Sequence, residues 1–265
     1  TYSTIASIIK YPYSSLSAQG KNKFGFFATE EETIREVATE LGLKQLGEDP
    51  LRYARHPLVY LVEAADDICY QIMDIEDACK LHILGYDEAQ GLIQGFFADD
   101  ELREIQHVAN TIGDPNERMG YLRSKAINLL VEEAASLFLD AEGAILAGTF
   151  EGSLIQHLSP RLLSAYQACS RTAYAKIYSA REVVDVELAG HRIFSALLDQ
   201  LIEAQMHPDH LYSRTLLSRV SSQYEMNHPT VYGRIQSSLD YISGMTDIYA
   251  LDLYRRITGM NLPAV

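Results

Sequence analysis

The sequence predicts an all-α protein. Hydrophobic side chains recur with the 3.6-residue period of a helix along most of the chain, whereas the two-residue alternation typical of strands is scarce. Prolines fall at the edges of the periodic segments, where a proline can begin a helix but cannot continue one. Neither an internal repeat nor a Gly/Ser-rich or Pro-rich linker divides the 265 residues, so we expect residues 1–265 to form one domain.

The expected elements follow in order along the chain. An amphipathic segment covers residues 1–10, and a polar surface loop containing Gly20, Lys21, Asn22 and Lys23 is expected over residues 14–25. A second loop at residues 207–210 separates the last two long segments. The strongest helical periodicity lies at residues 29–43, 57–84, 116–139, 153–177, 181–205 and 230–257.

Composition limits the class of protein. Lysine and arginine total 22 against 36 aspartates and glutamates, a net charge of −14, which repels polyphosphate and argues against a general nucleic-acid-coating role. The three cysteines form no C-x-x-C pair, which argues against a disulfide-built secreted domain, so a cytoplasmic location is expected. Neither a membrane span of about 18 apolar residues nor a signal peptide is expected.

The segment at 57–84 is the most informative. Pro57 suits a first helical turn, where its missing N–H would have no intrahelical partner. Side chains plotted at about 100° per residue separate into two faces. The expected core face holds Leu61, Ala65, Ile68, Ile72, Ile75 and Cys79, and Cys69 beside it is interpreted, like Cys79, as an inert core thiol. The opposite face holds Glu63, Asp66, Asp67, Tyr70, Asp74 and Asp77.

Within the polar face, Asp66, Tyr70 and Asp74 follow one another at i, i+4 and i+8. Carboxylates three or four residues apart on a helix repel each other by roughly a few tenths of a kcal/mol, and a cation would relieve the repulsion. The pattern leaves two interpretations open, a solvated acidic face or a line that binds metal and substrate. Mg²⁺ and Mn²⁺ prefer oxygen ligands, but a single helix supplies too few of them for a site.

The histidines do not complete a metal site. None of the eight is followed by aspartate. His56 is interpreted as a residue at the start of a helix, and the segment from His207 to His210 as a loop, because Pro208 prevents a helical i, i+3 arrangement. Glu104 and His107 match E-x-x-H, yet di-iron bundles need two such motifs and two more glutamates, so a solvent-facing turn is expected. The phosphate-loop, nucleophile-elbow and dinucleotide-binding motifs are absent from the sequence.

The stretch HPLVYLVEAADDICYQIMDIED, residues 56–77, resembles the deoxyguanosine triphosphate triphosphohydrolase family of the HD superfamily. Shorter similarities occur in the family's order along nearly the whole chain. They are TYST at 1–4 with KYP at 10–12, KFGFF at 23–27, YLRSKAIN at 121–128, IYS at 177–179 with ELAG at 187–190, and SGMTD at 243–247 with LYRR at 253–256. The resemblance implies an HD-type helical bundle, of which this chain is the portion C-terminal to the His-Asp motif.

The resemblance also implies an activity, namely cleavage of a deoxynucleoside triphosphate into deoxynucleoside and triphosphate with Mg²⁺ or Mn²⁺. Asp66 resembles the final metal-binding and catalytic aspartate, because only this register places Tyr70 at +4 against the deoxyribose and Asp74 at +8 on the 3′-hydroxyl. Lys10 and Tyr11 correspond to a Lys-Tyr pair that contacts the triphosphate. Glu187 resembles a glutamate near the base pocket, although a helix-surface carboxylate is the alternative.

The chain departs from the family in one respect: the family's first histidine, its His-Asp pair and the catalytic residues after that pair have no counterpart here. We therefore expect a fragment that lacks an N-terminal half, with a diverged remnant as the alternative. The expected partners are the substrate and further copies of the chain in a homo-oligomer. Two rival functions remain open, a non-catalytic helical oligomerisation or regulatory unit, and an HD phosphohydrolase acting on another nucleotide such as a nucleoside monophosphate.

Overall fold

The computed structural model describes residues 1–17 and 23–260, so Gly20, Lys21 and Asn22 of the expected polar loop lie outside the described residues. It is mostly helical, which confirms the predicted fold class. The chain divides into two compact units, Thr1–Ser179 and Ala180–Val265, each described below by itself. That the two units act as the single domain expected from the sequence stays a prediction.

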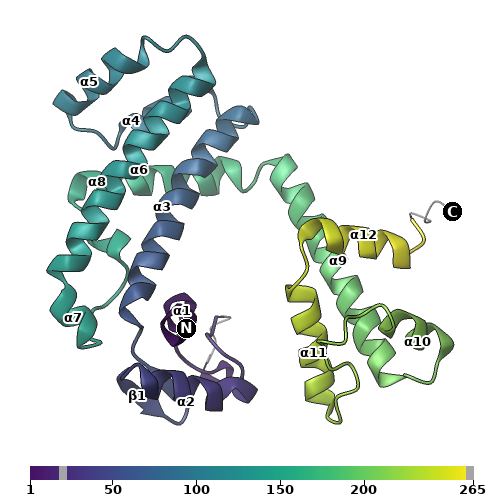
Figure 1. Ribbon diagram of the computed structural model, residues 1–265. Helices are drawn as coiled ribbons and strands as arrows, with labels where there is room; N and C mark the ends of the chain where they lie inside the picture. Colours follow the sequence, from purple (N-terminus) through teal and green to yellow (C-terminus); the bar gives the residue numbers. More distant parts are fainter. Residues whose placement is uncertain (18–22, 261–265) are drawn as a thin grey trace. The chain divides into compact units, whose positions relative to one another are not determined.

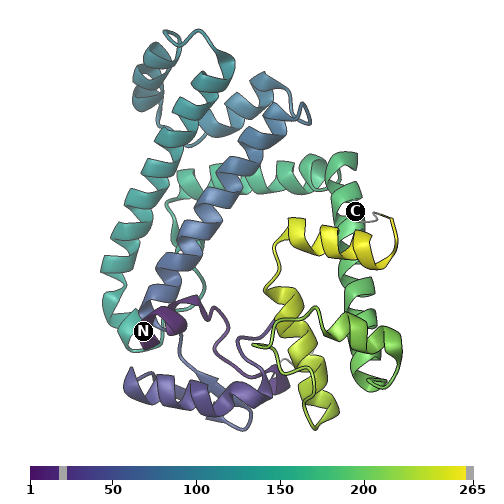
Figure 2. The ribbon, with the colours of Figure 1, turned by 45° about the vertical axis from the view of Figure 1, so that its right-hand side comes forward.

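Two long helices form the centre of the first unit. Helices α3 (Pro57–Lys80) and α6 (Pro115–Asp140) pack side by side, and α4 (Tyr86–Gln94) and α8 (Pro160–Thr172) pack against α3 (Figures 1 and 2). Fully buried side chains fill the space between them, among them Ile72 and Ile75 of α3 and Leu122 and Leu130 of α6. Burying each such side chain stabilises the fold by about 1.5–3 kcal/mol, so α3 is held firmly along its length.

The starts of these helices follow from the sequence. Proline occupies the first turn of α3, α6 and α8, as predicted. The Nδ1 atom of His56 accepts a hydrogen bond from the Leu58 N–H at 3.2 Å, which confirms His56 as the residue that starts α3. Asp114 caps α6 in the same way, because its Oδ1 accepts hydrogen bonds from the N–H groups of residues 116 and 117.

Shorter elements complete the first unit. Its further α-helices are α1 (Tyr2–Ile8), α2 (Glu31–Glu40), α5 (Asp99–Ala109) and α7 (Glu142–Leu146), and its 3-10 turns are Ser15–Ser17, Ala28–Glu30 and Leu154–His157. One antiparallel hairpin, β1 (Gln45–Glu48) and β2 (Leu51–Tyr53), was not predicted. Its strands are too short to show alternation, yet Leu51 and Tyr53 point into a small core with Phe26 and Ala38.

The expected helix at 153–177 is divided into three parts. After the 3-10 turn and α8, the chain makes one turn of π-helix, Ala173–Ile177, which we call the π turn. The Tyr178 N–H donates to the Ala173 carbonyl at 2.9 Å, the i to i+5 bond that defines such a turn. The extra residue in the turn changes the direction in which the following side chains point.

The second unit is built around α9 (Arg181–Met206), against which α10 (Leu211–Leu217), α11 (Val231–Ser243) and α12 (Asp247–Ile257) pack. Its core includes Leu197 and Leu201 of α9 and Tyr241 of α11. The expected helix at 230–257 breaks near Gly244, because Thr246 caps a new helix by accepting a hydrogen bond from Tyr249. Residues 207–210 form the predicted loop.

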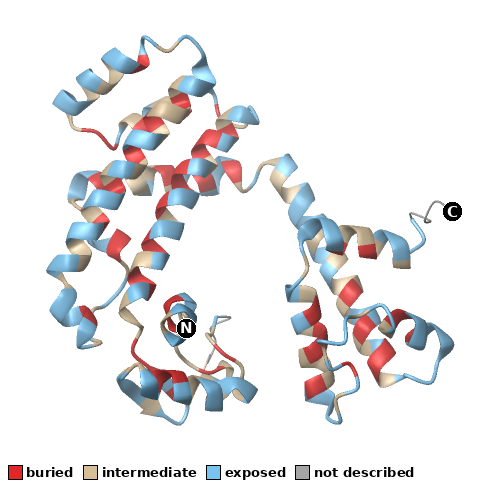
Figure 3. Ribbon diagram, in the orientation of Figure 1, coloured by how far each residue is buried: buried red, intermediate tan, exposed pale blue. Residues whose placement is uncertain are grey.

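Burial corrects several sequence expectations. The buried stripe of α3 passes through Ala64, Ile68, Ile72, Ile75 and Ala78, so Ala65 and Cys69 are exposed and Cys69 is not a core thiol (Figure 3). At the N-terminal end of α3, the predicted buried stripe was displaced by one residue from the observed one. Ser14, expected in a surface loop, is fully buried and forms a β-bridge with Phe26.

Glu63 is also buried, although helical periodicity placed it on the polar face. Among the described residues, no helix is long and apolar enough to cross a membrane.

Candidate functional site

The three residues of the predicted line lie in order along α3. Asp66 and Tyr70 are exposed, with 62% of the Tyr70 residue accessible, and Asp74 is half-buried. At about 1.5 Å of rise per residue, Asp66 and Asp74 lie about 12 Å apart along the helix. An exposed aromatic ring between two carboxylates offers a flat apolar surface with a polar group on each side, which suits a sugar.

Asp74 is held by a residue from outside its helix. The hydroxyl of Tyr178, the residue that follows the π turn, donates a hydrogen bond of 2.7 Å to Oδ2 of Asp74. Burial raises the pKa of Asp74, the Tyr178 hydrogen bond opposes the rise, and the nearby charge of Asp77 adds to it. Burial, together with the Asp74 carboxylate, raises the pKa of Tyr178. The Tyr178 phenol therefore keeps its proton and is the donor of the pair.

Asp66 and its neighbour Asp67 have different surroundings. Asp67 is half-buried and faces Lys10: burial raises its pKa, while the Lys10 charge lowers it. Asp66 is exposed and makes no ion pair among the described residues. The two carboxylates thus differ in what they are free to bind, and Asp66 is the one that begins the i, i+4, i+8 row with Tyr70 and Asp74.

Glu63 connects α3 to the N-terminal segment. Its side chain is 7% exposed, and its two oxygens bind two cations, Lys10 Nζ at 3.0 Å and Arg55 Nη1 at 3.0 Å. Burial alone would lower the pKa of Lys10, but the hydrogen bond and charge of Glu63 outweigh it, and the pKa of Lys10 is raised. A buried carboxylate needs such partners, and this explains why Glu63 departs from the expected solvent face.

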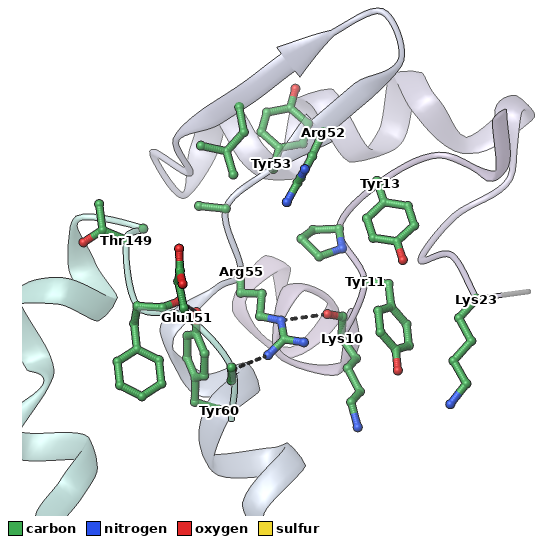
Figure 4. Close-up of a pocket in the computed structure, with 16 residues that line it drawn as sticks. Lys10, Tyr11, Tyr13, Lys23, Arg52, Tyr53, Arg55, Tyr60, Thr149 and Glu151 are labelled. Carbon is green, nitrogen blue, oxygen red and sulfur yellow. Dashed lines mark hydrogen bonds between the residues drawn. The ribbon is translucent and has the colours of Figure 1, made fainter. Parts of the chain in front are cut away.

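Arg55 joins three segments around this carboxylate. Besides Glu63, its guanidinium donates to the Lys10 carbonyl at 3.0 Å and to the Gly152 carbonyl at 3.2 Å (Figure 4). The Tyr60 hydroxyl donates a hydrogen bond to the Phe150 carbonyl, which belongs to the same loop as Gly152. Gly148 lets this loop lie close to Ala54. Its φ is +66°, and a Cβ at this position would lie 2.7 Å from Cβ of Ala54.

These segments enclose a pocket of about 830 Å³. Four cations line it, namely Lys10, Lys23, Arg52 and Arg55, against one carboxylate, Glu151. The aromatic rings of Tyr11, Tyr13, Tyr53 and Tyr60 also line it, and Figure 4 shows them around the opening. In a chain of net charge −14, this local excess of positive charge favours an anionic ligand.

The structure brings together some of the predicted residues and separates others. Lys10 and Tyr11 line the pocket, whereas Asp66, Tyr70 and Asp74 lie along α3 beyond it. Glu63, about one helical turn before Asp66, links the two groups through Lys10. Glu187 belongs to the second unit, where it is an exposed residue of α9.

Sequence reasoning missed three residues of this region. Arg52 and Arg55 lie just before α3. Two positively charged residues directly before an acidic helix were the sequence signal that could have identified them. Tyr178 was part of a quoted similarity, but nothing in the local sequence connects it to Asp74, which lies 104 residues earlier.

The metal prediction finds incomplete support in the chain's own residues. No group of three or more His, Cys, Asp or Glu side chains that could hold a metal ion occurs in residues 1–17 and 23–260. Glu104 and His107 are both exposed, in agreement with the predicted solvent-facing turn. His207 and His210 stack on each other at 5.4 Å, and His207 pairs with Glu203. The described residues therefore do not form a metal site by themselves.

Comparison with known proteins agrees with the resemblance. Residues 156–256 match the family described as phosphohydrolase-associated domain. All of the chain aligns at 32% identity with a protein of Pseudomonas aeruginosa named deoxyguanosinetriphosphate triphosphohydrolase-like protein, of which it covers 61%. A protein of the same name from Synechocystis is 34% identical over 99% of the chain and 60% of its own length.

A Salmonella arizonae protein named deoxyguanosinetriphosphate triphosphohydrolase is 29% identical over 98% of the chain and 60% of its own length. The chain thus spans about 60% of the length of these relatives.

Proposed function

We propose, from the premise that this chain is related along its whole length to the deoxyguanosinetriphosphate triphosphohydrolase-like proteins, that it serves in the hydrolysis of a deoxynucleoside triphosphate to deoxynucleoside and triphosphate. The observation that carries the proposal is the i, i+4, i+8 row of Asp66, Tyr70 and Asp74 along α3, in which Asp66 and Tyr70 are exposed and the half-buried Asp74 is held by Tyr178.

The sugar end of the substrate lies at Tyr70 and Asp74 in this proposal. The Tyr70 ring packs flat on the deoxyribose and leaves no room for a 2′-hydroxyl. Asp74 accepts a hydrogen bond from the 3′-hydroxyl, a role that suits an ionised carboxylate because it has acceptor positions and no proton to donate. Together these contacts give a steric preference for deoxyribose and a polar contact that positions it.

The triphosphate extends toward the pocket. Lys10 lies next to α3 at Glu63 and also lines the pocket, so it can contact phosphate oxygens from its half-exposed position. Tyr11 and the guanidinium groups of Arg52 and Arg55 add donors on the same side. Arg55 has a second role, because its bonds to Lys10, Glu63 and Gly152 keep the walls of the pocket together.

Asp66 supplies one oxygen ligand to a divalent cation, Mg²⁺ or Mn²⁺, in this proposal. Its exposure and its lack of an ion pair among the described residues leave the carboxylate available. The other ligands do not come from the described residues, so the chemistry of water activation is not assigned to side chains of this chain.

Product analysis tests the proposal and separates it from its rivals. The native protein that carries this sequence is incubated with dGTP and Mg²⁺ or Mn²⁺, and the products are separated by ion-exchange chromatography. The expected products are deoxyguanosine and intact triphosphate. Orthophosphate release would instead indicate another phosphohydrolase reaction. Absence of turnover in a self-associating protein would indicate a helical oligomerisation unit.

A further inference from the structure

We propose that Tyr178 is a positioning residue for the sugar contact. Its hydroxyl fixes one carboxylate oxygen of Asp74 so that the other is presented to the 3′-hydroxyl of the ligand. Tyr178 thereby sets how strongly the protein prefers a sugar that carries this hydroxyl. The inference rests on the proposed function, because it takes Asp74 as the residue that contacts the sugar.

The first support is the geometry of the pair. The hydrogen bond joins Tyr178 Oη to Oδ2 of Asp74 at 2.7 Å, an ordinary length for an O–H···O hydrogen bond. An aspartate side chain on a helix can otherwise turn about two torsions, and its two oxygens are equivalent. A fixed Oδ2 removes that freedom, so Oδ1 faces in one direction before the ligand arrives.

The second support is that Tyr178 is itself held in place. Its ring meets the edge of the Tyr174 ring, with centroids 5.3 Å apart and planes at 84°. The preceding residue, Ile177, is buried in the core of the first unit. Lys176 bonds to Glu88 of α4 at 2.6 Å and anchors the π turn to a second helix. A hydroxyl on so restrained a ring can define the orientation of its acceptor.

The third support is the π turn that directs Tyr178 toward α3. The turn follows α8 directly, and it replaces the regular i to i+4 hydrogen-bond pattern at the end of that helix. Here the turn lies directly before Tyr178, whose own N–H makes the i to i+5 bond. The backbone irregularity and the Asp74 contact are therefore at the same residue.

A purely structural role for Tyr178 makes a different prediction. If the hydroxyl only satisfied a half-buried carboxylate, its loss would weaken binding of every nucleotide by the same factor. If it positions Asp74 for the 3′-hydroxyl, its loss weakens the binding of ligands that carry this hydroxyl and leaves the binding of ligands that lack it unchanged. The ratio between two such ligands therefore distinguishes the two roles.

The experiment compares dGTP with 2′,3′-dideoxyguanosine triphosphate in the native protein and in Tyr178→Phe, which keeps the ring and removes the hydroxyl. In the unmodified protein, kcat/KM favours dGTP by about tenfold or more, as expected for a hydrogen bond to a charged group. Tyr178→Phe should reduce this ratio to about threefold or less, mainly through KM for dGTP. Equilibrium binding of deoxyguanosine and 2′,3′-dideoxyguanosine, followed by NMR, gives the same ratio without turnover.

Two further variants make the result decisive. Tyr174→Phe removes an exposed hydroxyl of the same π turn that makes no hydrogen bond with a described residue, and it should leave the ratio unchanged. Asp74→Ala should remove the preference for dGTP over the dideoxy analogue. The double variant Asp74→Ala/Tyr178→Phe should show the same ratio as Asp74→Ala alone. An unchanged ratio in Tyr178→Phe, with the ratio lost in Asp74→Ala, overturns the role of Tyr178 and leaves the proposed function standing. An unchanged ratio in Asp74→Ala overturns both the role of Tyr178 and the placement of the 3′-hydroxyl at Asp74, whereas the proposed hydrolysis itself is tested by the product analysis.

Discussion

The ammonium group of Lys10 lies 3.0 Å from Oε1 of Glu63, a carboxylate that is almost fully buried at the start of α3. Arg55 binds the second oxygen of the same carboxylate. This contact joins the N-terminal segment to the helix that carries Asp66, Tyr70 and Asp74. It therefore connects the basic pocket to the proposed sugar site.

Removal of the Glu63 charge should destabilise the protein. In Glu63→Gln, two partly buried cations lose their shared anion, and we expect the free energy of unfolding to fall by about 1–3 kcal/mol. The matched control is Glu48→Gln, because Glu48 pairs with Arg35 on the surface, where such a pair contributes about 0–1 kcal/mol. Urea denaturation measures both. Equal losses of unfolding free energy in the two variants would show that burial does not make the Glu63 ion pairs more stabilising than a surface pair.

The pH dependence of the 3′-hydroxyl preference should report on Asp74. Burial raises the pKa of this carboxyl, with the Asp77 charge adding and the Tyr178 hydrogen bond opposing. Since the ionised form is the acceptor, the preference for dGTP over the dideoxy analogue is present at neutral pH. It should disappear as the pH falls through the raised pKa of Asp74, which begins at a higher pH than for an ordinary aspartate.

The smaller preference that remains in Tyr178→Phe should be lost at a still higher pH, because the hydrogen bond that lowers the pKa of Asp74 is gone. The kcat/KM ratio measured from pH 8 downward follows the change. A ratio that does not vary with pH would show that the charge on Asp74 is not what recognises the hydroxyl.

Shortening Tyr70 should relax the selection of deoxyribose. A ribose hydroxyl buried against its ring without a partner costs on the order of 1–3 kcal/mol, about ten- to a hundredfold in kcat/KM. Tyr70→Ala should lower activity toward dGTP and narrow the ratio between dGTP and GTP. Met73→Ala serves as the control, since Met73 is an exposed apolar residue of α3 outside the Asp66–Tyr70–Asp74 line. If both nucleotides lose activity by the same factor in Tyr70→Ala, the sugar is selected elsewhere.

Metal binding by residues 1–265 alone should be weak. A single available carboxylate at Asp66, without a further cluster of ligands in the described residues, predicts dissociation constants for Mg²⁺ and Mn²⁺ of roughly millimolar or weaker. Isothermal titration calorimetry measures them, and Asp66→Asn should weaken the binding further. Micromolar binding would contradict the statement that most ligands lie outside these residues.

The long helices were predictable because they combine periodicity with local start signals. Ile68, Ile72 and Ile75 repeat at helical spacing and are all buried, and Pro57 begins α3 where expected. The hairpin of β1 and β2 was not predictable from alternation, because its two strands have only four and three residues. Its stability comes from Leu51 and Tyr53, which pack on residues distant in sequence.

Within the candidate site, the pattern on α3 was visible but its partners were not. The spacing of Asp66, Tyr70 and Asp74 is a local property of one helix. The burial of Glu63 depends on Lys10 and Arg55, and the orientation of Asp74 depends on Tyr178, which belongs to another part of the fold. Helical periodicity assigns a carboxylate to a solvent face unless cations from other segments meet it there, and periodicity alone does not reveal such cations.

Comparison of Asp66→Asn with Asp67→Asn in the native protein decides whether the substrate follows the row Asp66–Tyr70–Asp74 along α3. The two carboxylates are neighbours on α3, but only Asp66 is exposed and in line with Tyr70 and Asp74, whereas Asp67 faces Lys10. Triphosphate release from dGTP should be abolished in Asp66→Asn and largely kept in Asp67→Asn. Equal loss of triphosphate release in the two variants would contradict the account, because the line Asp66–Tyr70–Asp74 would then not be the one that the substrate follows.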